Sequence, residues 1–240
     1  MTLLIVLPTY NERPNIEAVS ERILSHEFAR LLVVDDESPD GTAEAAEALA
    51  ARFPGRIEVM HRRGPRGLGL AYNDGLRRAL ASGVDAIGQM DADFSHDPAY
   101  LPDLMAALEH HDLVIGSRYL RGVSVVNWPL HRLFLSVFAN RYIRFITGMT
   151  THDCTSGFRI WRREALARMP LDRARANGYA FLTEMLFAAA KRGCRIGEVP
   201  IIFVERQKGY SKVSSGVLME SLMTPWRLVL RSGRVSAARP

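Results

Sequence analysis

The sequence predicts an α/β fold in which a mostly parallel sheet carries helices on both faces. In the first half of the chain, short apolar runs typical of strands alternate with amphipathic segments typical of helices. The apolar runs are continuous, as expected of strands buried on both faces of a parallel sheet. Polar clusters follow four of these runs, and parallel strands bring such clusters to one edge. We therefore expect a ligand site at that edge.

The elements of the first half follow in order along the chain. We expect strands over residues 3–8, 30–36, 57–62, 85–93 and 112–119. Helices are expected over residues 15–26, 40–53, 98–110 and from the turn RGPRGLG to about residue 81. Asn15 is the expected N-cap of the first helix, because its side chain can accept a hydrogen bond from the first turn.

The second half is less regular. We expect helices over residues 130–148 and 179–192, a strand over 195–206, and a helical tail on either side of Pro225. No repeat or linker divides the chain. We therefore predict one domain over residues 1–231 and a disordered tail over residues 232–240.

Composition narrows the class of protein. The 240 residues are 48% apolar and carry a formal net charge of +5, which suits a globular protein with an anionic partner. No basic run is interleaved with aromatic residues, which argues against a nucleic-acid partner. Cys154 and Cys194 are too few for a disulfide framework. No segment predicts a signal peptide or a transmembrane helix, so we expect a soluble or peripherally attached protein.

The stretch IGQMDADFSHDP, residues 87–98, ends an apolar run on two carboxylates. Asp91 and Asp93 would share one face of an extended segment and would repel unless a cation lies between them. Mg²⁺ or Mn²⁺ fits, because these ions take oxygen ligands and bind through one or two carboxylates plus substrate phosphates. A solvated loop is the alternative. His96 is expected to shape the turn into the next helix rather than to act as a base.

Two further segments resemble phosphate sites. The stretch RRGPRGLGLA, residues 62–71, has neither the P-loop ending nor the dinucleotide fingerprint, so its glycines are expected to allow close packing. The stretch ERQKGYSK, residues 205–212, could close over a diphosphate, with a solvated loop as the alternative. The basic residues gathered in the second half are Arg118, Arg132, Arg159, Arg206, Lys208 and Lys212.

Residues 132–146 predict a helix with a narrow polar stripe on an otherwise apolar surface. The stripe consists of Arg132, Ser136, Asn140 and Arg144. Such a helix lies either in the core or in a membrane interface, where its stripe would turn toward the site. The tail around Trp226 could add a second amphipathic contact with the membrane interface.

Eight strings together resemble family 2 glycosyltransferases of the Rossmann-like GT-A fold, and among them the polyprenol-phosphate (dolichol-phosphate) mannosyltransferases. They are PTYNERPN, VVDDESPDGT, GLGLAY, MDADFSHDP, GSRY, DCTSGFR, GEVPI and ERQKGYSK. The likeness runs from about residue 3 to residue 215, with the motifs in the family's order.

The resemblance implies roles for individual residues. Donor binding falls to Pro8, Tyr10, Glu12, Val34, Asp36, Asp91, Ala92, Asp93, Arg118, Arg206 and Lys212. The catalytic group is Asp91, Asp93, Arg118, Arg206 and Lys212. The acceptor phosphate falls to Arg118, Arg132 and Ser136. A divalent metal, Mg²⁺ or Mn²⁺, falls to Asp91, Asp93 and Ser95.

The resemblance also implies a reaction, namely transfer of mannose from GDP-mannose to a polyprenyl (dolichyl-type) phosphate. The protein would bind peripherally at the cytoplasmic face of a membrane. In some relatives a partner protein anchors the chain there. The acceptor is a phosphate monoester with a second pKa near ~6, so it is ionised at neutral pH and needs no general base. A single in-line displacement would give a β-linked product. A different donor such as UDP-glucose, or a non-catalytic nucleotide-sugar-binding module, are the alternatives.

Overall fold

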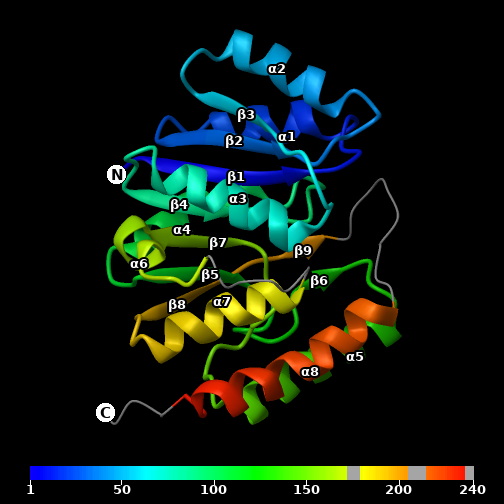
Figure 1. Cartoon of the computed structure of the whole chain (residues 1–240), viewed down its shortest axis with the longest axis vertical. Helices are drawn as coiled ribbons and strands as arrows, with labels where there is room; N and C mark the ends of the chain where they lie inside the picture. The colour runs from blue at the N-terminus through cyan, green and yellow to red at the C-terminus, as the bar shows by residue number, and fades with distance from the viewer. Residues whose placement is uncertain (172–178, 205–214, 236–240) are drawn as a thin grey trace.

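A seven-stranded sheet forms the centre of the molecule (Figure 1). The computed structural model describes residues 1–171, 179–204 and 215–235. The large sheet has the order β3-β2-β1-β4-β7-β5-β8, and a small sheet pairs β6 with β9. The strands are β1 Leu3–Thr9, β2 Ala29–Asp35, β3 Ile57–His61, β4 Ala86–Gln89, β5 Leu113–Ser117, β6 Val125–Val126, β7 Arg159–Arg162, β8 Ile196–Pro200 and β9 Phe203–Val204. The helices are α1 Ile16–Leu24, α2 Thr42–Arg52, α3 Leu68–Leu80, α4 Leu101–Leu108 after a 3₁₀ turn at Pro98–Tyr100, α5 Leu130–Thr147, α6 Arg163–Ala167, α7 Tyr179–Lys191 and α8 Ser215–Ser232.

The large sheet is parallel except at β7, which runs antiparallel to both β4 and β5. The register of β1 with β2 runs from Leu3↔Ala29 to Thr9↔Asp35. The predicted class, a mostly parallel sheet with helices on both faces, is confirmed. The sequence pattern does not predict β7, because its four residues, RIWR, carry two arginines and form no apolar run.

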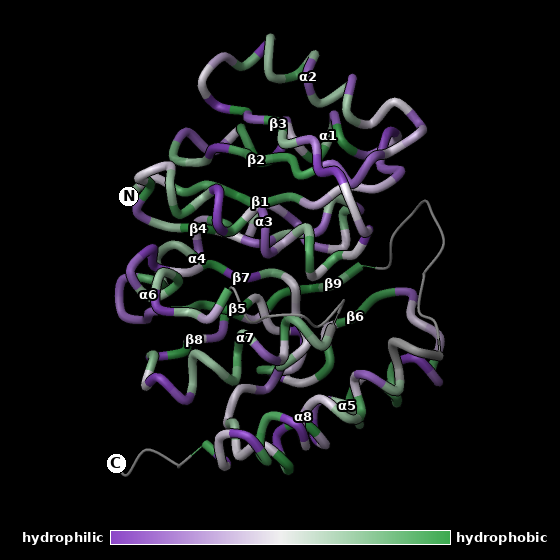
Figure 2. Tube along the Cα trace, in the orientation of Figure 1, coloured by the Kyte–Doolittle hydropathy of each residue, from purple (hydrophilic) through white to green (hydrophobic). Residues whose placement is uncertain are grey.

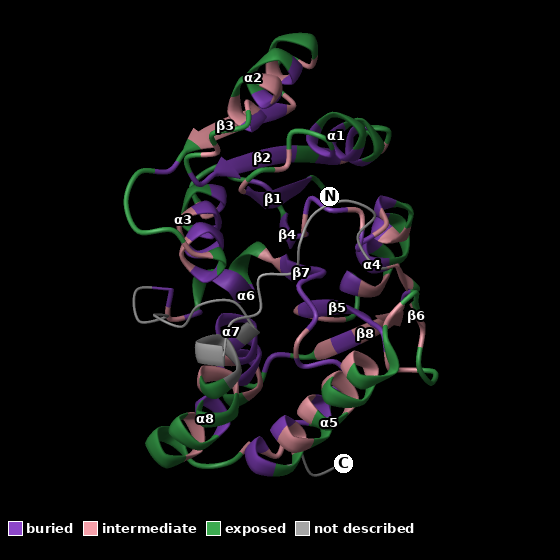
Figure 3. Cartoon of the chain, turned by 90° about the vertical axis from the view of Figure 1, so that its right-hand side faces the viewer, coloured by how far each residue is buried: buried purple, intermediate pink, exposed green. Residues whose placement is uncertain are grey.

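Helices cover both faces of the sheet (Figure 3). α3, α6 and α7 pack on one face, and α1, α2 and α4 pack on the other. Successive residues of β1 point to opposite faces, so that Leu4 and Val6 enter the first core while Leu3, Ile5 and Leu7 enter the second. This alternation explains why the strand is an unbroken apolar run.

The carboxyl ends of β1, β2, β4 and β5 lie at one edge, on the right of Figure 1 and toward the viewer in Figure 3. The predicted convergence of the polar clusters at this edge follows from the parallel pairing. The small β6–β9 sheet lies at the same edge (Figure 1).

Several predicted boundaries are wrong. β4 ends at Gln89 rather than at residue 93, so Asp91 and Asp93 lie in the turn beyond the strand. The strand predicted over residues 195–206 breaks into β8 and β9, and β9 leaves the large sheet to pair with β6. The prediction that the tail is helical on either side of Pro225 is confirmed: α8 runs through the proline as one helix, and its packing against α5 and α7 offsets the backbone hydrogen bond that proline removes.

Asn15 takes the N-cap position of α1, as predicted, but its side chain makes no hydrogen bond to the first turn. Its Nδ2 instead donates to Glu12 Oε2 at 2.8 Å. The backbone N–H groups of Asn15 and Ile16 both donate to the Glu12 carbonyl at 2.9 Å, so a tight turn leads directly into the helix.

Residues 232–235, where the expected disordered tail begins, lie within the described residues. α8 continues to Ser232, and the residues after it contact the end of α5. The backbone N–H of Val235 donates to the Thr147 carbonyl at 2.8 Å, and the Arg234 guanidinium donates to the Phe145 carbonyl at 2.7 Å. Residues 236–240 lie outside the described residues.

α5 and α8 pack against each other at the end of the molecule that lies lowest in Figures 1 and 2. The Tyr142 hydroxyl of α5 donates to the Leu222 carbonyl of α8 at 2.9 Å. The large apolar side chains that the two helices expose are Leu130, Phe134, Leu135, Phe138, Phe145, Met219, Leu222, Met223, Trp226 and Leu230. α5 is therefore not an ordinary core helix. Within the described ranges, no helix is long and apolar enough to cross a membrane.

Candidate active site

Asp91 and Asp93 lie in the turn that follows β4, at the carboxyl edge of the sheet. Asp93 is buried, and its Oδ1 accepts hydrogen bonds from the Ser95 backbone N–H at 3.1 Å and the Ser95 hydroxyl at 2.6 Å. Phe94 takes a positive φ of 62°, which lets the chain reverse tightly between the two. Ala92, between the aspartates, is buried.

The carboxylate of Asp91 is more open, with about a third of the side chain exposed (36%). Its Oδ1 accepts a hydrogen bond of 2.8 Å from the hydroxyl of Tyr72, a fully buried residue of α3. Burial, together with the negative charge of Asp91, raises the pKa of Tyr72 well above its ordinary value, so the phenol stays protonated and acts as the donor.

His96 has the structural role that the sequence predicts. Its ring is buried between Phe158, at a centroid distance of 5.2 Å, and Phe203, at 5.6 Å. Burial lowers the pKa of His96, which favours the neutral imidazole. The backbone N–H of Asp91 donates to His96 Nδ1 at 3.1 Å, so this nitrogen is an acceptor and holds the turn closed.

The donor set around this turn fits a hard divalent cation. Asp91 and Asp93 offer carboxylate oxygens and Ser95 offers a hydroxyl, and these are the ligand types that Mg²⁺ and Mn²⁺ take. In the part of the chain that the structure describes, no group of three His, Cys, Asp or Glu side chains could hold a metal.

The segments after β1 and β2 lie beside this turn. Pro8 and Val34 are register partners with buried side chains, so they present backbone to the edge. Tyr10 is partly exposed, and Arg66 lies 4.6 Å from the centre of its ring. Glu12 is also partly exposed, and its backbone N–H donates to the Thr42 hydroxyl at 3.0 Å.

Asp36 stabilises the glycine-rich loop. Its carboxylate pairs with the buried guanidinium of Arg62 and accepts a 2.9 Å hydrogen bond from the Gly67 backbone N–H. Arg62 Nε also contacts Asp74 of α3 at 2.7 Å. The loop expected to pack closely is thus held to both β2 and α3 by these charged groups.

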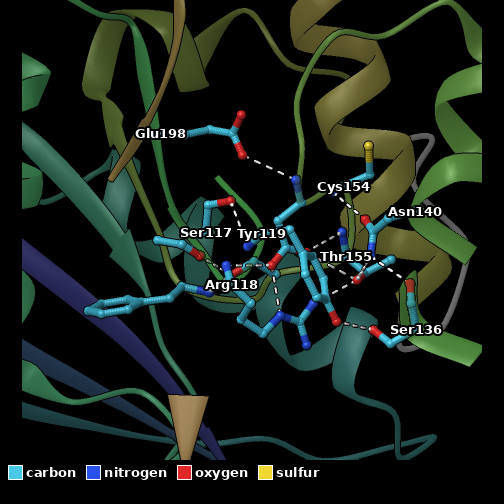
Figure 4. Close-up of polar contacts among 12 residues, drawn as sticks. Ser117, Arg118, Tyr119, Ser136, Asn140, Cys154, Thr155 and Glu198 are labelled. Atoms are coloured by element: carbon cyan, nitrogen blue, oxygen red, sulfur yellow. Dashed lines mark hydrogen bonds and ion pairs between the residues drawn. The ribbon is translucent and has the colours of Figure 1, made fainter. Parts of the chain in front are cut away.

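Arg118 follows β5 and is buried (Figure 4). Its Nε and one terminal nitrogen each lie 2.7 Å from an oxygen of Asp153, and the same terminal nitrogen donates to the Thr155 hydroxyl at 2.8 Å. The guanidinium also lies within 5.6 Å of the ring centres of Trp128 and Phe203. Arg118 therefore sits in an aromatic and acidic enclosure.

α5 contributes the other predicted acceptor residues. Arg132 lies 4.3 Å from the Trp128 ring centre, so Arg118 and Arg132 both lie against that ring. Ser136 accepts a 2.7 Å hydrogen bond from the Tyr119 hydroxyl (Figure 4). Two residues of the polar stripe of α5, Arg132 and Ser136, thus lie beside residues that follow β5.

Asn140 and Glu198 hold the segment between α5 and β7. Asn140 Oδ1 accepts from the Cys154 backbone N–H at 2.7 Å, and its Nδ2 donates to the Ser136 carbonyl at 3.0 Å (Figure 4). Glu198 of β8 accepts from the backbone N–H groups of residues 152 and 153, at 2.9 and 3.1 Å. These bonds fix Asp153, which in turn fixes Arg118.

Some predicted residues take other places. Arg159 is fully buried in β7 and donates to the carbonyls of Ser156, Leu182 and Cys154, so it is not available to a substrate phosphate. Its burial lowers the pKa of the guanidinium to about 10. Arg206, Lys208 and Lys212 lie outside the described residues.

Sequence reasoning missed four residues at the edge. They are Tyr72, Asn140, Asp153 and Glu198. Tyr72, Asp153 and Glu198 lie in the strings GLGLAY, DCTSGFR and GEVPI, and Asn140 lies in the polar stripe of α5. The sequence pattern alone indicates no individual role for them. Their contacts join residues from 14 to 46 positions apart, which no local pattern reveals.

A family model described as glycosyl transferase family 2 matches residues 4–169. The chain belongs to glycosyl transferase family 2. It is 42% identical over 239 residues to polyprenol monophosphomannose synthase of Mycolicibacterium smegmatis, a match that covers 98% of this chain and 89% of that protein. It is also 42% identical over 234 residues to undecaprenyl-phosphate mannosyltransferase of Micrococcus luteus, with 96% of each chain covered.

Solved structures resemble this glycosyltransferase in fold. One is glucosyl-3-phosphoglycerate synthase of Mycobacterium tuberculosis with Mn²⁺, UDP and glucosyl-3-phosphoglycerate, at a TM-score of 0.68 and 22% identity over 98% of this chain and 81% of that one. Another is the same synthase with Mn²⁺ and UDP-glucose, at a TM-score of 0.67 and 23% identity over 98% of this chain and 80% of that one. The predicted GT-A fold is confirmed.

Proposed function

We propose that this glycosyltransferase transfers mannose from GDP-mannose to a polyprenyl monophosphate and releases GDP. The observation that carries the proposal is the 42% identity, over nearly the whole chain, to two proteins named for mannosyl transfer to polyprenyl phosphates. The site supports it with a pair of carboxylates after β4 and with two arginines that lie against Trp128 at the same edge of the sheet. The exposed apolar side chains of α5 would contact the lipid chain of such an acceptor.

The donor would bind at the turn that carries Asp91, Ala92 and Asp93, which we call the D-x-D turn. Asp91, Asp93 and Ser95 would hold the divalent cation, which when bound would neutralise negative charge on the leaving diphosphate. Tyr10 and Glu12 would contact the nucleoside, with the backbone at Pro8, Val34 and Asp36 forming the floor. Arg206 and Lys212 stay in the proposal as diphosphate contacts on the resemblance alone.

The acceptor would attack without a general base. A phosphate monoester with a second pKa near ~6 is largely a dianion at neutral pH, so its oxygen is already a nucleophile. His96 supports this view, because its Nδ1 accepts the Asp91 N–H and its ring is buried, which leaves it no path to a substrate proton. The protein must instead align two anions that repel each other.

Arg118, Arg132 and Ser136 would hold the acceptor phosphate. Both guanidinium groups lie within 5.6 Å of the Trp128 ring centre, so both could reach an acceptor phosphate bound beside that ring. Ser136 accepts a hydrogen bond from the hydroxyl of Tyr119, the residue that follows Arg118. A single in-line displacement from this side would invert the anomeric carbon and give polyprenyl phosphate β-mannose.

The chain would bind the membrane peripherally through α5 and α8. Their exposed apolar side chains include Phe134, Phe138 and Trp226. Arg141, Arg227 and Arg231 are exposed on the same helices, and basic residues that flank an apolar face favour anionic lipid surfaces.

One experiment tests the proposed function. The purified protein is incubated with labelled GDP-mannose, a polyprenyl phosphate and Mg²⁺ or Mn²⁺, and the lipid product is isolated. We expect a mannosyl phospholipid whose anomeric configuration is β by NMR, and an α product would refute the inverting mechanism. Asp93→Ala is expected to lower the rate at least about 100-fold, as for loss of one group that stabilises transition-state charge.

The same assay separates the alternatives. A glucosyl lipid formed faster from UDP-glucose would assign another donor to the same chemistry. Binding of GDP-mannose without any product, under every metal and lipid tried, would favour a non-catalytic nucleotide-sugar-binding module.

A further inference from the structure

The carboxylate of Asp91 is held by a residue from a different part of the chain. Tyr72 lies on α3, 19 residues earlier, and its hydroxyl donates to Asp91 Oδ1 at 2.8 Å. Tyr72 is fully buried, whereas about a third of the Asp91 side chain (36%) is exposed. A buried phenol thus donates to the inner side of a carboxylate that faces the site.

The position of Tyr72 is rigid. Its ring stacks on Phe181 of α7 with ring centres 6.3 Å apart and planes 2° apart. One turn later, α3 approaches the sheet so closely at Gly75 that a Cβ there would lie 2.5 Å from Val6 and 2.8 Å from Val34. Because α3 is wedged against β1 and β2, the hydroxyl has little freedom to move away from Asp91.

The remaining sides of Asp91 are also constrained. Its backbone N–H donates to His96 Nδ1 at 3.1 Å. The backbone at Gly157 lies so near that a Cβ there would be 3.5 Å from both carboxylate oxygens. Of these three neighbours, the Tyr72 hydroxyl makes the hydrogen bond to a carboxylate oxygen, at 2.8 Å, whereas His96 Nδ1 lies 3.8 Å from the other oxygen.

We propose that Tyr72 is a positioning residue for the cation site, whose hydroxyl fixes the Asp91 carboxylate in the orientation that binds a divalent ion. This inference rests on the proposed function, which makes Asp91 a ligand. A hydrogen bond from a second residue fixes the orientation of a ligating carboxylate, and loss of such a bond typically weakens metal binding 10–100-fold. Tyr72 itself does not touch the substrate or the ion.

Tyr72→Phe removes the hydroxyl and keeps the ring that packs on Phe181. Without the bond, the Asp91 carboxylate can rotate, so ordering it costs more free energy when the ion binds. The matched control is Tyr142→Phe, which removes a hydroxyl that makes a hydrogen bond of similar length, 2.9 Å, between α5 and α8. Both variants lose one phenol hydrogen bond, but only one of them loses a bond to Asp91.

The test measures the Kd for Mn²⁺ in the presence of GDP. Electron paramagnetic resonance detects the Mn²⁺ that stays free in solution. We expect the Kd for Mn²⁺ to rise about tenfold or more in Tyr72→Phe and to stay at the wild-type value in Tyr142→Phe. A rise smaller than about threefold relative to Tyr142→Phe would overturn the role of Tyr72, and any larger rise supports it.

Two further measurements keep the result decisive. Melting in EDTA shows whether Tyr72→Phe folds, and in transfer assays its rate should return to near the wild-type maximum at saturating Mn²⁺. A lower maximum with an unchanged Mn²⁺ midpoint would mean a structural defect and would overturn the inference. Asp93→Asn should abolish the Mn²⁺ binding of the wild-type protein. If the wild-type protein binds no Mn²⁺, or if Asp93→Asn binds it equally well, the proposed metal centre is wrong and so is the role of Tyr72.

Discussion

The guanidinium of Arg118 and the carboxylate of Asp153 form a two-bond pair in the protein interior, with 2.7 Å for each bond. Asp153 is fully buried, and Glu198 anchors its backbone N–H from β8 at 3.1 Å. The pair therefore joins β5, β8 and the segment before β7. We infer that Asp153 sets the position of Arg118 at the edge of the site.

Asp153→Asn is expected to destabilise the protein and to lower transfer. Removing one partner leaves the other charge buried without compensation, which typically costs about 3–5 kcal/mol. Asp112→Asn is the matched control, because Asp112 pairs with Arg195 at an exposed position. Chemical denaturation should show a large loss of unfolding free energy for the first variant and little change for the second. Equal losses would contradict a special role for the buried pair.

The same pair predicts a pH dependence of stability. Burial raises the pKa of Asp153, but the charge and hydrogen bonds of Arg118 outweigh burial and hold the pKa below its usual value. The unfolded chain, with an ordinary aspartate pKa of about 3.9, then binds its proton first as pH falls. The stabilisation is thus fully present above that value and is lost as pH falls through the lowered pKa of the folded state.

Unfolding free energies measured between neutral pH and about pH 2 check this sign. The gap between wild type and Asp153→Asn should be constant above about pH 5 and should narrow below about pH 4. A gap that widens on acidification would show that the carboxylate is not stabilised by Arg118.

His96→Asn is expected to keep the pH profile of transfer. The acceptor phosphate ionises with a second pKa near ~6, so the rate should rise through that pH in wild type and variant alike. The variant should lose some stability, because His96 packs between Phe158 and Phe203. If the rise with pH disappears in the variant while it stays folded, His96 would be the base and the base-free mechanism would be wrong.

The sheet could be predicted because its strands carry their signal locally. β1 and β2 are unbroken apolar runs, and each is followed by polar residues that parallel pairing brings to one edge. The pair of carboxylates after β4 is visible in a few letters for the same reason, but the pattern places Asp91 and Asp93 in an extended segment, whereas they lie in the turn beyond Gln89. His96 was rightly predicted to shape the turn, because a proline and an aspartate follow it.

The rest depends on contacts between distant segments. Tyr72 has the sequence signature of any core aromatic residue on a helix, and its bond to Asp91 exists only because α3 is wedged against the sheet. In the sequence, Arg159 looks like any other basic residue. In the structure, its three side-chain nitrogens donate hydrogen bonds to backbone carbonyls in the core. β7 goes unpredicted because pairing on both sides, rather than an apolar pattern, makes it a strand.

The exposed face of α5 predicts lipid binding. Phe134 and Phe145 are 70% and 76% exposed, and burying such side chains in a lipid interface stabilises the bound state by about 1.5–3 kcal/mol each. Phe145→Ser should therefore lower the affinity for anionic phospholipid vesicles at least about tenfold. Leu68→Ser is the matched control, since Leu68 is an exposed apolar residue at the start of α3. Vesicle sedimentation measures both, and similar losses would contradict binding through α5.

Substitution of Asn140 is expected to change the KM for the acceptor but not the KM for the donor. It is buried in α5 and bonds the Cys154 N–H, the Ser136 carbonyl and, at 3.3 Å, the Thr155 hydroxyl, which itself contacts Arg118. Asn140→Leu keeps the volume and removes these bonds, so α5 loses its register against the segment that carries Asp153. We expect the KM for polyprenyl phosphate to rise about tenfold, the equivalent of one lost buried hydrogen bond.

The KM for the sugar nucleotide should stay within about twofold, because the D-x-D turn makes no bond to Asn140 in the described structure. Asn73→Leu is the control, since Asn73 is also buried and donates to the Leu171 carbonyl at 2.8 Å, far along the chain from α5. It should cost stability without raising the acceptor KM. Parallel rises in both KM values for Asn140→Leu would show general loosening of the fold rather than a role for α5 in placing the acceptor.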